Sequence, residues 1–148
     1  MVIMNHFEIF GFRPSYDLDE SDLLTRYFNL QKRNRRQEDV LIILNTSFEI
    51  LRDPLKRAGH FLSLKYPDAT NEIPQNVTME MFSIREKFAE INSQSEREEF
   101  LKDLEKKKND LLDQMHNIGC EKFSELYCFA KFLDSFIKQV EDHVEHRN

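Results

Sequence analysis

The sequence predicts an all-α fold in which an N-terminal helical hairpin is followed by an antiparallel three-helix bundle. Residues that interrupt helices are rare, since the 148 positions contain only three glycines and four prolines. Apolar residues recur three or four positions apart in most segments, which is typical of helices with one buried face. No segment alternates apolar and polar residues over the length of a useful strand. These observations favour packed helices over a sheet.

Short polar signals indicate the first helix and the start of the second. Residues 5–12 predict a short helix that stops near Gly11. Asp17 and Glu20 have the spacing of a capping box, so we expect the second helix to start there. Its apolar face follows the helical repeat and consists of Leu23, Tyr27 and Leu30.

A cluster of basic residues, Lys32, Arg33, Arg35 and Arg36, lies at the end of the second helix. Whether the chain turns back there determines the fold of the N-terminal half. The third apolar stripe consists of Leu41, Leu44, Phe48 and Leu51. Its residues pair in reverse order with those of the second stripe, for example Tyr27 with Phe48. The sum of the two residue numbers is nearly the same in every pair, as it is in an antiparallel hairpin. We therefore expect a hairpin whose tip is Asn34 to Asp39. The alternative is one continuous helix, which would expose both stripes and lead to a swapped dimer.

The pair Asp53-Pro54 ends the third helix and predicts a fourth from Leu55 to Lys65. The next segment is rich in Pro, Asp and Asn, which is the chemistry of a linker. The chain accordingly divides into an N-terminal domain, a linker and a C-terminal bundle at 1–66, 67–77 and 78–148.

Three further helices are expected in the C-terminal bundle, at 78–92, 93–117 and 120–146. Ser93 and Glu96 have capping-box spacing at the start of the middle helix, and Gly119 marks its end. Two apolar stripes can line a shared core. One consists of Phe100, Leu104, Leu111, Leu112 and Met115, and the other of Phe123, Leu126, Tyr127, Ala130, Leu133, Ile137, Val140 and Val144.

Composition narrows the class of function. The net charge of −6 argues against nucleic acid as the main partner. No apolar run approaches the roughly 20 residues that span a bilayer, and the N-terminus lacks the pattern of a secretory signal. Cys120 and Cys128 lie two helical turns apart, ~12 Å, which is too far for a mutual disulfide. Free thiols are typical of a reducing compartment, so we expect a cytoplasmic protein, or one of the mitochondrial matrix or a related organelle in a eukaryote.

No catalytic centre, metal site or cofactor is predicted. His6, His60 and His116 have no Ser or Cys partner at a suggestive spacing, and no Gly-rich phosphate loop is present. His143 and His146 are three residues apart and could share a metal, but a third ligand is not evident. Exposed tail histidines are the simpler interpretation, and the protein is not expected to be an enzyme.

Five segments resemble the HscB-type J-protein co-chaperones of iron–sulfur cluster assembly. They are NHFEIFGF at 5–12, SYDLDESDLLTRYFNLQK at 15–32, LRDPLKRAGHFLSL at 51–64, MEMFSIREKFAEI at 79–91 and FAKFLDSFIKQVE at 129–141. The family has an opening "xYFELFGL" helix, then "LxxRFxxLQ", "LxxPLxRAxYLL" and "MExLExREELxEI", and a terminal helix with "LRFLDKL". The resemblance covers nearly the whole chain in the right order, and it is most specific at 51–64.

The resemblance implies a J domain that docks a DnaK- or HscA-type chaperone ATPase and a bundle that holds an IscU-type scaffold. In the family, "LQxxY" is followed by His-Pro-Asp and a flexible loop of about a dozen residues. Here Arg35, Arg36 and Gln37 hold the triad positions, and the third helix arrives early. We therefore expect a monomeric co-chaperone or adaptor whose stimulation of ATP hydrolysis is weak or lost. The alternative is a helical interaction protein that dimerises through an opened or swapped hairpin.

The resemblance also assigns residues to two surfaces. The scaffold-binding surface comprises Met79, Phe82, Glu86, Glu90 and Phe132. Thr78 and Ser83 depart from the family pattern there, and the alternative is that Met79 and Phe82 only pack the bundle. The chaperone-binding surface comprises Arg26, Lys32, Arg33, Arg35 and Arg36. The alternative for these cations is a solvated helix end that favours the helix dipole.

Overall fold

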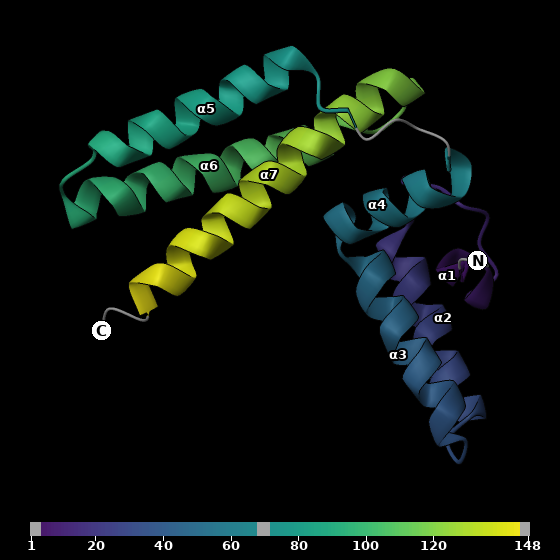
Figure 1. Ribbon diagram of the computed structural model, residues 1–148. Helices are drawn as coiled ribbons and strands as arrows, with labels where there is room; N and C mark the ends of the chain where they lie inside the picture. The colour runs from purple at the N-terminus through teal and green to yellow at the C-terminus, as the bar shows by residue number, and fades with distance from the viewer. Residues whose placement is uncertain (1–3, 68–71, 146–148) are drawn as a thin grey trace. The chain divides into compact units, whose positions relative to one another are not determined.

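The computed structural model describes residues 4–67 and 72–145, with side chains up to residue 142 (Figure 1). Every regular element in these ranges is a helix, so the predicted all-α class is confirmed. The chain forms two compact units, Met1–Ala69 and Thr70–Asn148. The helices are α1 (His6–Ile9), α2 (Glu20–Arg33), α3 (Glu38–Arg52), α4 (Pro54–Lys65), α5 (Gln75–Glu90), α6 (Gln94–Gln114) and α7 (Cys120–Glu145). Within the described ranges, none of them combines the length and apolarity that crossing a membrane requires.

The short helix α1 supplies aromatic residues to the core of the first unit. The side-chain oxygen of Asn5 accepts a hydrogen bond from the backbone of Glu8, which caps the helix start. Phe7 and Phe10 are buried, at 0% and 4% exposure. Gly11 ends the helix with a φ of 77°, a left-handed conformation in which a Cβ is strained.

The capping box predicted at the start of the second helix is wrong by two residues. Asp19 is the N-cap, because its Oδ1 accepts hydrogen bonds from the backbone N–H groups of Ser21 and Asp22 at 3.0 and 3.2 Å. The backbone N–H of Asp17 instead donates to the Ser15 hydroxyl, in a local turn before the helix. Asp17 and Asp19 lie two positions apart, and either could cap the helix. The capping-box spacing alone favoured Asp17, which is not the N-cap.

The helices α2 and α3 form the predicted hairpin. Leu23, Leu44 and Leu51 are buried between them, and the rings of Tyr27 and Phe48 stack with centroids 4.1 Å apart. These contacts confirm the reversed pairing of the two stripes.

The tip of the hairpin lies at residues 34–37, inside the predicted range. The backbone N–H of Gln37 donates to the carbonyl of Asn34 at 2.9 Å, and the Asn34 side-chain amide donates to the carbonyl of Leu30 at 2.8 Å. The last turn of α2 contains basic residues and the first turn of α3 contains acidic residues. Cations stabilise a helix C-terminus and anions a helix N-terminus, so this order favours two separate helices. The continuous helix is therefore not the conformation of this structure.

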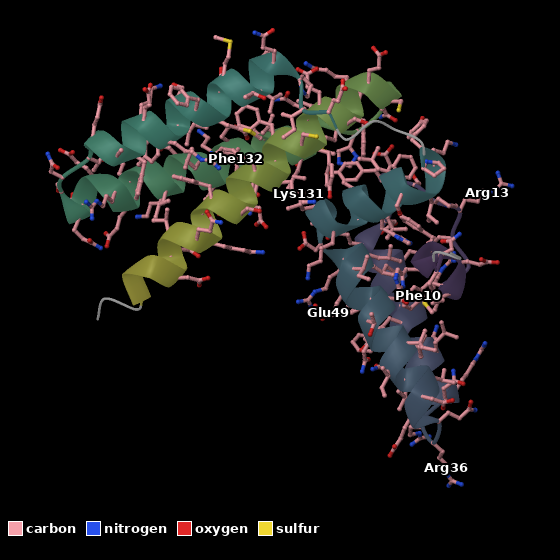
Figure 2. The ribbon with its side chains drawn as sticks, in the orientation of Figure 1. Phe10, Arg13, Arg36, Glu49, Lys131 and Phe132 are labelled. Atoms are coloured by element: carbon pink, nitrogen blue, oxygen red, sulfur yellow. The ribbon has the colours of Figure 1, made fainter. Side chains whose placement is uncertain are left out.

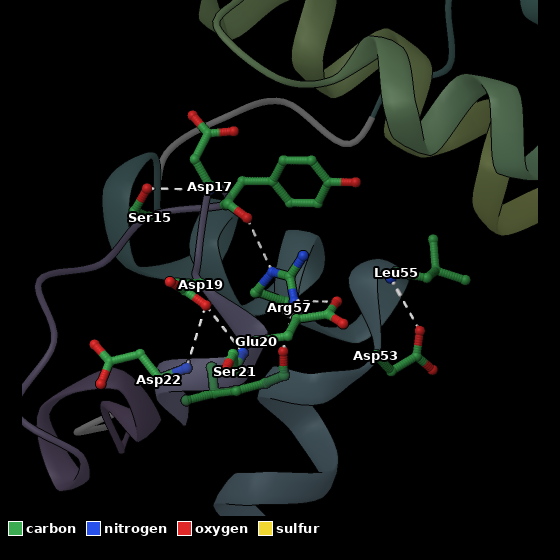
Figure 3. A network of polar contacts seen from close by, with 11 residues as sticks. Ser15, Asp17, Asp19, Glu20, Ser21, Asp22, Asp53, Leu55 and Arg57 are labelled. Carbon is green, nitrogen blue, oxygen red and sulfur yellow. Dashed lines mark hydrogen bonds and ion pairs between the residues drawn. The ribbon is translucent and has the colours of Figure 1, made fainter. Parts of the chain in front are cut away.

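The fourth helix begins at Pro54, one residue before the predicted start, and it carries a buried cation. Asp53 caps α4 through the backbone N–H of Leu55, and Pro54 is its first residue. Arg57 is only 3% exposed. Its guanidinium donates to the backbone carbonyls of Tyr16 and Leu51 at 2.9 and 2.8 Å (Figure 3). It therefore ties the segment before α2 to the end of α3.

The second unit begins earlier than predicted. The helix α5 starts at Gln75, directly after Pro74, rather than at Thr78. The reason is that Pro74 serves as the N-cap and its carbonyl accepts the backbone N–H of Thr78, while Val77 is buried at 2% exposure. The predicted linker is therefore too long at its C-terminal end, and residues 68–71 of it lie outside the described residues.

The ends of α6 were predicted with mixed success. The Ser93 hydroxyl accepts the backbone N–H of Glu96 at 3.5 Å, so the predicted N-cap is present. The helix ends at Gln114, and Asn117 adopts a φ of 57°. Asn117 thus supplies the left-handed residue of this connection, the role expected of Gly119.

The second unit is a three-helix bundle whose core contains most residues of the two predicted stripes, although Phe100, Tyr127 and Val140 are only half-buried. Buried residues of α6, α7 and their connection include Leu104, Leu111, Leu112, Met115, Phe123, Leu126, Ala130, Leu133 and Ile137. Phe129 is also buried and was not predicted. Phe88 of α5 joins the three helices, because its ring lies 6.0 Å from that of Phe100 and 5.5 Å from that of Phe136.

Candidate protein-binding surfaces

The helix α5 exposes two large apolar side chains. Met79 is 65% exposed and Phe82 is 63% exposed, whereas Val77 and Ile84 face the core at 2% and 6%. Met79 and Phe82 therefore do not pack the bundle, and that alternative is wrong. Three residues separate them, so they lie on adjacent turns of one face.

Carboxylates continue the same face. Glu86 and Glu90 are exposed and follow Phe82 at helical spacing. An exposed Met and Phe beside two carboxylates give this face an apolar centre and an acidic edge. We call Met79, Phe82, Glu86 and Glu90 the α5 patch.

Phe132 is less accessible than the α5 patch. It lies on α7, where it is half-buried (Figure 2). Its ring stacks near that of Phe136 with centroids 5.9 Å apart, and the Arg85 guanidinium lies 5.2 Å from the ring centre. Arg85 belongs to α5, so it connects Phe132 to the helix that carries the patch.

The hairpin tip exposes four of the five predicted basic residues. Lys32, Arg33, Arg35 and Arg36 are exposed and make no ion pair within residues 4–67. Figure 2 shows Arg36 at the far end of the hairpin, pointing away from it. The tip therefore gathers four exposed cations directly before the exposed carboxylates of Glu38 and Asp39.

Arg26 makes contacts within the first unit that the sequence did not suggest. Its Nη1 donates to the backbone carbonyl of Phe10 at 2.8 Å, and its guanidinium lies 4.1 Å from the ring centre of Phe12. A salt bridge to Asp22 at 3.2 Å completes its contacts. Arg26 therefore holds the residues after α1 against α2 while its side chain remains 39% exposed, and its assignment to the chaperone-binding surface stays a prediction.

The sequence did not reveal a buried His–Ser cluster. His6 Nδ1 lies 2.7 Å from the hydroxyl of Ser47, and the backbone N–H of His6 donates to His60 Nε2 at 3.0 Å. Burial lowers the pKa of both histidines, and for His60 the charge of His6 lowers it further. No sequence spacing indicated this contact, because 41 residues separate His6 from Ser47.

This cluster is structural. Ser47 is fully buried, at 0% exposure, so a substrate does not reach its hydroxyl. The ring of His60 also stacks on Phe7 with centroids 5.4 Å apart. The contacts attach α1 to α3 and α4, and only the fold could have brought them together.

No metal-binding constellation is found among the described residues. They contain no group of three or more His, Cys, Asp or Glu side chains that could hold an ion. Cys120 and Cys128 are free and half-buried, and burial raises the pKa of the Cys128 thiol. The side chains of His143 and His146, considered above as a metal pair, lie outside the described residues.

Comparisons with known proteins bear on both units. Co-chaperone protein HscB homologs of Shewanella sp. strain W3-18-1 and of Shewanella oneidensis are each 34% identical to this chain over 82 residues. Each match covers 47% of this chain and 47% of the relative, so the chain spans about half the length of these curated relatives. No family model matches the chain.

The match includes positions of the relatives that this chain lacks. It counts 82 positions, whereas 47% of the 148 residues of this chain is about 70. About a dozen matched positions of the relatives therefore have no counterpart here.

Solved structures extend the likeness in fold. The chaperone HscB from Vibrio cholerae has a TM-score of 0.64 at 24% identity, with 95% of this chain and 99% of that chain covered. Human co-chaperone protein HscB has a TM-score of 0.67 at 18% identity, with 97% and 82% covered. The resemblance read from the motifs is thus confirmed: the chain is similar to HscB-type co-chaperones in sequence over half its length and in fold over nearly all of it.

Proposed function

We propose that this protein is a co-chaperone adaptor in iron–sulfur cluster assembly that holds an IscU-type scaffold through its bundle. The proposal rests mainly on the α5 patch. Its Met79 and Phe82 are more than three-fifths exposed, and they lie on the helix that the resemblance assigns to scaffold binding. Monomeric proteins usually bury such side chains, and each is worth roughly 1.5–3 kcal/mol when covered. The similarity to HscB co-chaperones supplies the class of partner.

The acidic edge of the patch supports a partner with basic residues. Glu86 and Glu90 are exposed on α5, and neither forms an ion pair with another described residue. Charges at the rim of an interface mainly raise the association rate and select the partner. We therefore expect the scaffold to have an apolar pocket bordered by Lys or Arg side chains.

The hairpin tip supports a weakened contact with a DnaK- or HscA-type chaperone ATPase. Four exposed cations suit a transient encounter with an acidic surface. Arg35, Arg36 and Gln37, however, stand where the triad is expected, in a tight turn closed by the backbone of Asn34 and Gln37. A match in which about a dozen positions of the relatives have no counterpart here is in keeping with a shortened loop. Stimulation of ATP hydrolysis is therefore weak or lost.

A binding assay with an IscU-type scaffold tests the main proposal. The Phe82→Ala variant should lower the affinity by about tenfold or more, because truncating an aromatic anchor at the centre of an interface costs on the order of 2 kcal/mol. Adding Phe132→Ala should lower it further. The control is Ile43→Ala, which truncates an exposed apolar residue in the hairpin. Equal binding by Phe82→Ala and the control would remove the proposed surface.

An ATPase assay tests the hairpin. The purified protein should accelerate a cognate chaperone ATPase far less than a J-protein that has the triad. Acceleration of equal size would show that the triad positions are not needed, and it would leave the scaffold result unaffected.

A further inference from the structure

The apolar pattern of the hairpin continues through its tip without a change of phase. Residues seven positions apart occupy two core positions of one heptad repeat from α2 to α3. The first position is held by Leu23, Leu30, Gln37, Leu44 and Leu51, and the second by Tyr27, Asn34, Leu41 and Phe48. Two helices joined by a turn do not need a common phase, because the turn lets each helix rotate independently. A common phase is needed where both belong to one long helix.

The residues of the tip are compatible with such a helix. Positions 34–37 contain no glycine, proline or β-branched residue, and Arg and Gln are good helix formers. The helical backbone is interrupted most clearly at Gln37, whose ψ is 89°, and Gln37 gives α3 no side-chain cap. The first backbone N–H groups of a helix have no partner within that helix. In a continuous helix, the carbonyls of the tip would accept these N–H groups of α3.

The charged side chains of the tip would also gain neighbours of opposite sign. Arg35, Arg36, Glu38 and Asp39 are exposed, and none of them forms an ion pair with another described residue. In one helix, Glu38 would follow Arg35 by three positions, and Asp39 would follow Arg36 by three. Residues at this spacing are neighbours on a helix surface. The mixed charge of the tip therefore suits a straight helix as well as a turn.

We propose that the hairpin opens at Gln37 and that two copies of this chain exchange their hairpin arms. Figure 1 shows α2 and α3 side by side in the closed form. In the exchanged dimer, α3 of one copy would cover α2 of the other. The stacking of Tyr27 on Phe48, now at 4.1 Å between ring centroids, would form again between the copies. The partner is a second copy because the two apolar stripes already match each other.

The heptad pattern is symmetric about Gln37. Leu30 and Leu44 each lie seven positions from it, and Leu23 and Leu51 each lie 14 positions from it. Antiparallel packing of two continuous helices would therefore set Gln37 opposite Gln37 of the second copy. There the two side-chain amides can donate to and accept from each other. A polar residue at a core position fixes the register of such a dimer and lowers its stability. The closed monomer accordingly predominates at low concentration, and the dimer forms as the concentration rises.

Light scattering of the full chain over a range of concentrations tests the proposal. Gln37→Leu makes this core position apolar, so the dissociation constant of the dimer should fall by about tenfold or more. Gln37→Gly disfavours a helix at the same position in both copies, so the constant should rise by about tenfold. The matched control is Arg36→Leu, which changes an exposed neighbour outside the two core positions. It should leave the constant within about threefold of the wild type.

Isotope-filtered NMR distinguishes exchanged arms from a dimer of closed hairpins. A dimer assembled from isotope-labelled and unlabelled chains should show a contact between the Tyr27 ring of one copy and the Phe48 ring of the other. In a dimer of closed hairpins, this contact remains within each copy. Circular dichroism checks that each variant remains folded.

Three results would overturn the inference. The first is a monomer at every concentration in both the wild type and Gln37→Leu. The second is an equal dissociation constant for Gln37→Leu and Gln37→Gly. The third is a dimer in which the rings of Tyr27 and Phe48 make no contact between copies, because closed hairpins then pack through another surface. The inference concerns the first unit alone, so its failure would leave the scaffold proposal unaffected.

Discussion

Arg57 shows at the scale of one residue how the first unit satisfies buried polar groups. Replacing it by Met keeps much of the volume but leaves the carbonyls of Tyr16 and Leu51 without their donor. A buried acceptor left unpaired costs about 1–3 kcal/mol, so Arg57→Met should lower the melting temperature clearly. Thermal unfolding followed by circular dichroism measures the change.

The matched control is Arg52→Met on the neighbouring helix. Arg52 pairs with Glu49, but the two side chains are 58% and 55% exposed. Exposed ion pairs contribute at most about 1 kcal/mol, so the control should unfold near the wild type. Equal melting temperatures for Arg57→Met and Arg52→Met would show that the buried guanidinium does not stabilise the unit.

His6 and His60 make the stability of the first unit sensitive to pH. The pKa of each is lowered by burial below the ordinary value of 6.5, so the folded state favours neutral rings. Above that value both states are neutral and the histidines add no pH dependence. As the pH falls below about 6.5, the unfolded chain binds protons first, and the free energy of unfolding should decrease.

Urea unfolding at a series of pH values measures this effect. His60→Gln keeps an acceptor for the backbone N–H of His6 but does not titrate, so its stability should decline less between pH 7 and pH 5. An identical decline in His60→Gln and the wild type would assign the pH dependence to other groups.

At the scale of elements, patterns that depend on many residues predicted the fold well. The reversed pairing of the two apolar stripes predicted the hairpin, and Tyr27 stacks on Phe48 as that pairing requires. Single-residue signals were less reliable, because neighbouring polar residues compete for one role. Asp19 rather than Asp17 caps α2, and Asn117 rather than Gly119 takes the left-handed position.

The candidate surfaces show the same division. The resemblance supplied Met79 and Phe82, and their exposure agrees with a binding role. It could not show that Arg26 is held by Phe10 and Phe12, because that contact needs the segment after α1 to fold back on α2. The Ser47 cluster was hidden for the same reason.

The hairpin tip provides a prediction at this scale. Asn34→Ala removes the side-chain hydrogen bond to Leu30 that closes α2, which should cost about 0.5–1.5 kcal/mol. The loss also weakens the turn relative to a continuous helix, so the dimer fraction seen by light scattering should rise. The control Asn29→Ala changes an exposed mid-helix residue and should not lower stability. Matching stability and mass for the two variants would contradict this account of the turn.

At the scale of the whole molecule, charge is distributed unevenly between the units. Residues 1–69 contain ten basic and ten acidic residues, whereas residues 70–148 contain 11 basic and 17 acidic ones. The net charge of −6 therefore lies entirely in the second unit. A basic scaffold surface would be attracted to the second unit rather than to the first.

Each unit also has its own core, which leads to the prediction about the whole chain. Phe7, Leu23 and Leu51 are buried in the first unit, and Leu133, Met115 and Phe123 are buried in the second. Separate fragments 1–69 and 70–148 should therefore both be helical and unfold cooperatively, as domains with their own cores do. The fragment 70–148 should bind the scaffold within about threefold of the full chain, since an intact site keeps its contacts. The fragment 1–69 should not bind it. Calorimetry with each folded fragment measures this, and retention of scaffold binding by 1–69 alone, or its loss from 70–148, would mean that the α5 patch is not the scaffold site.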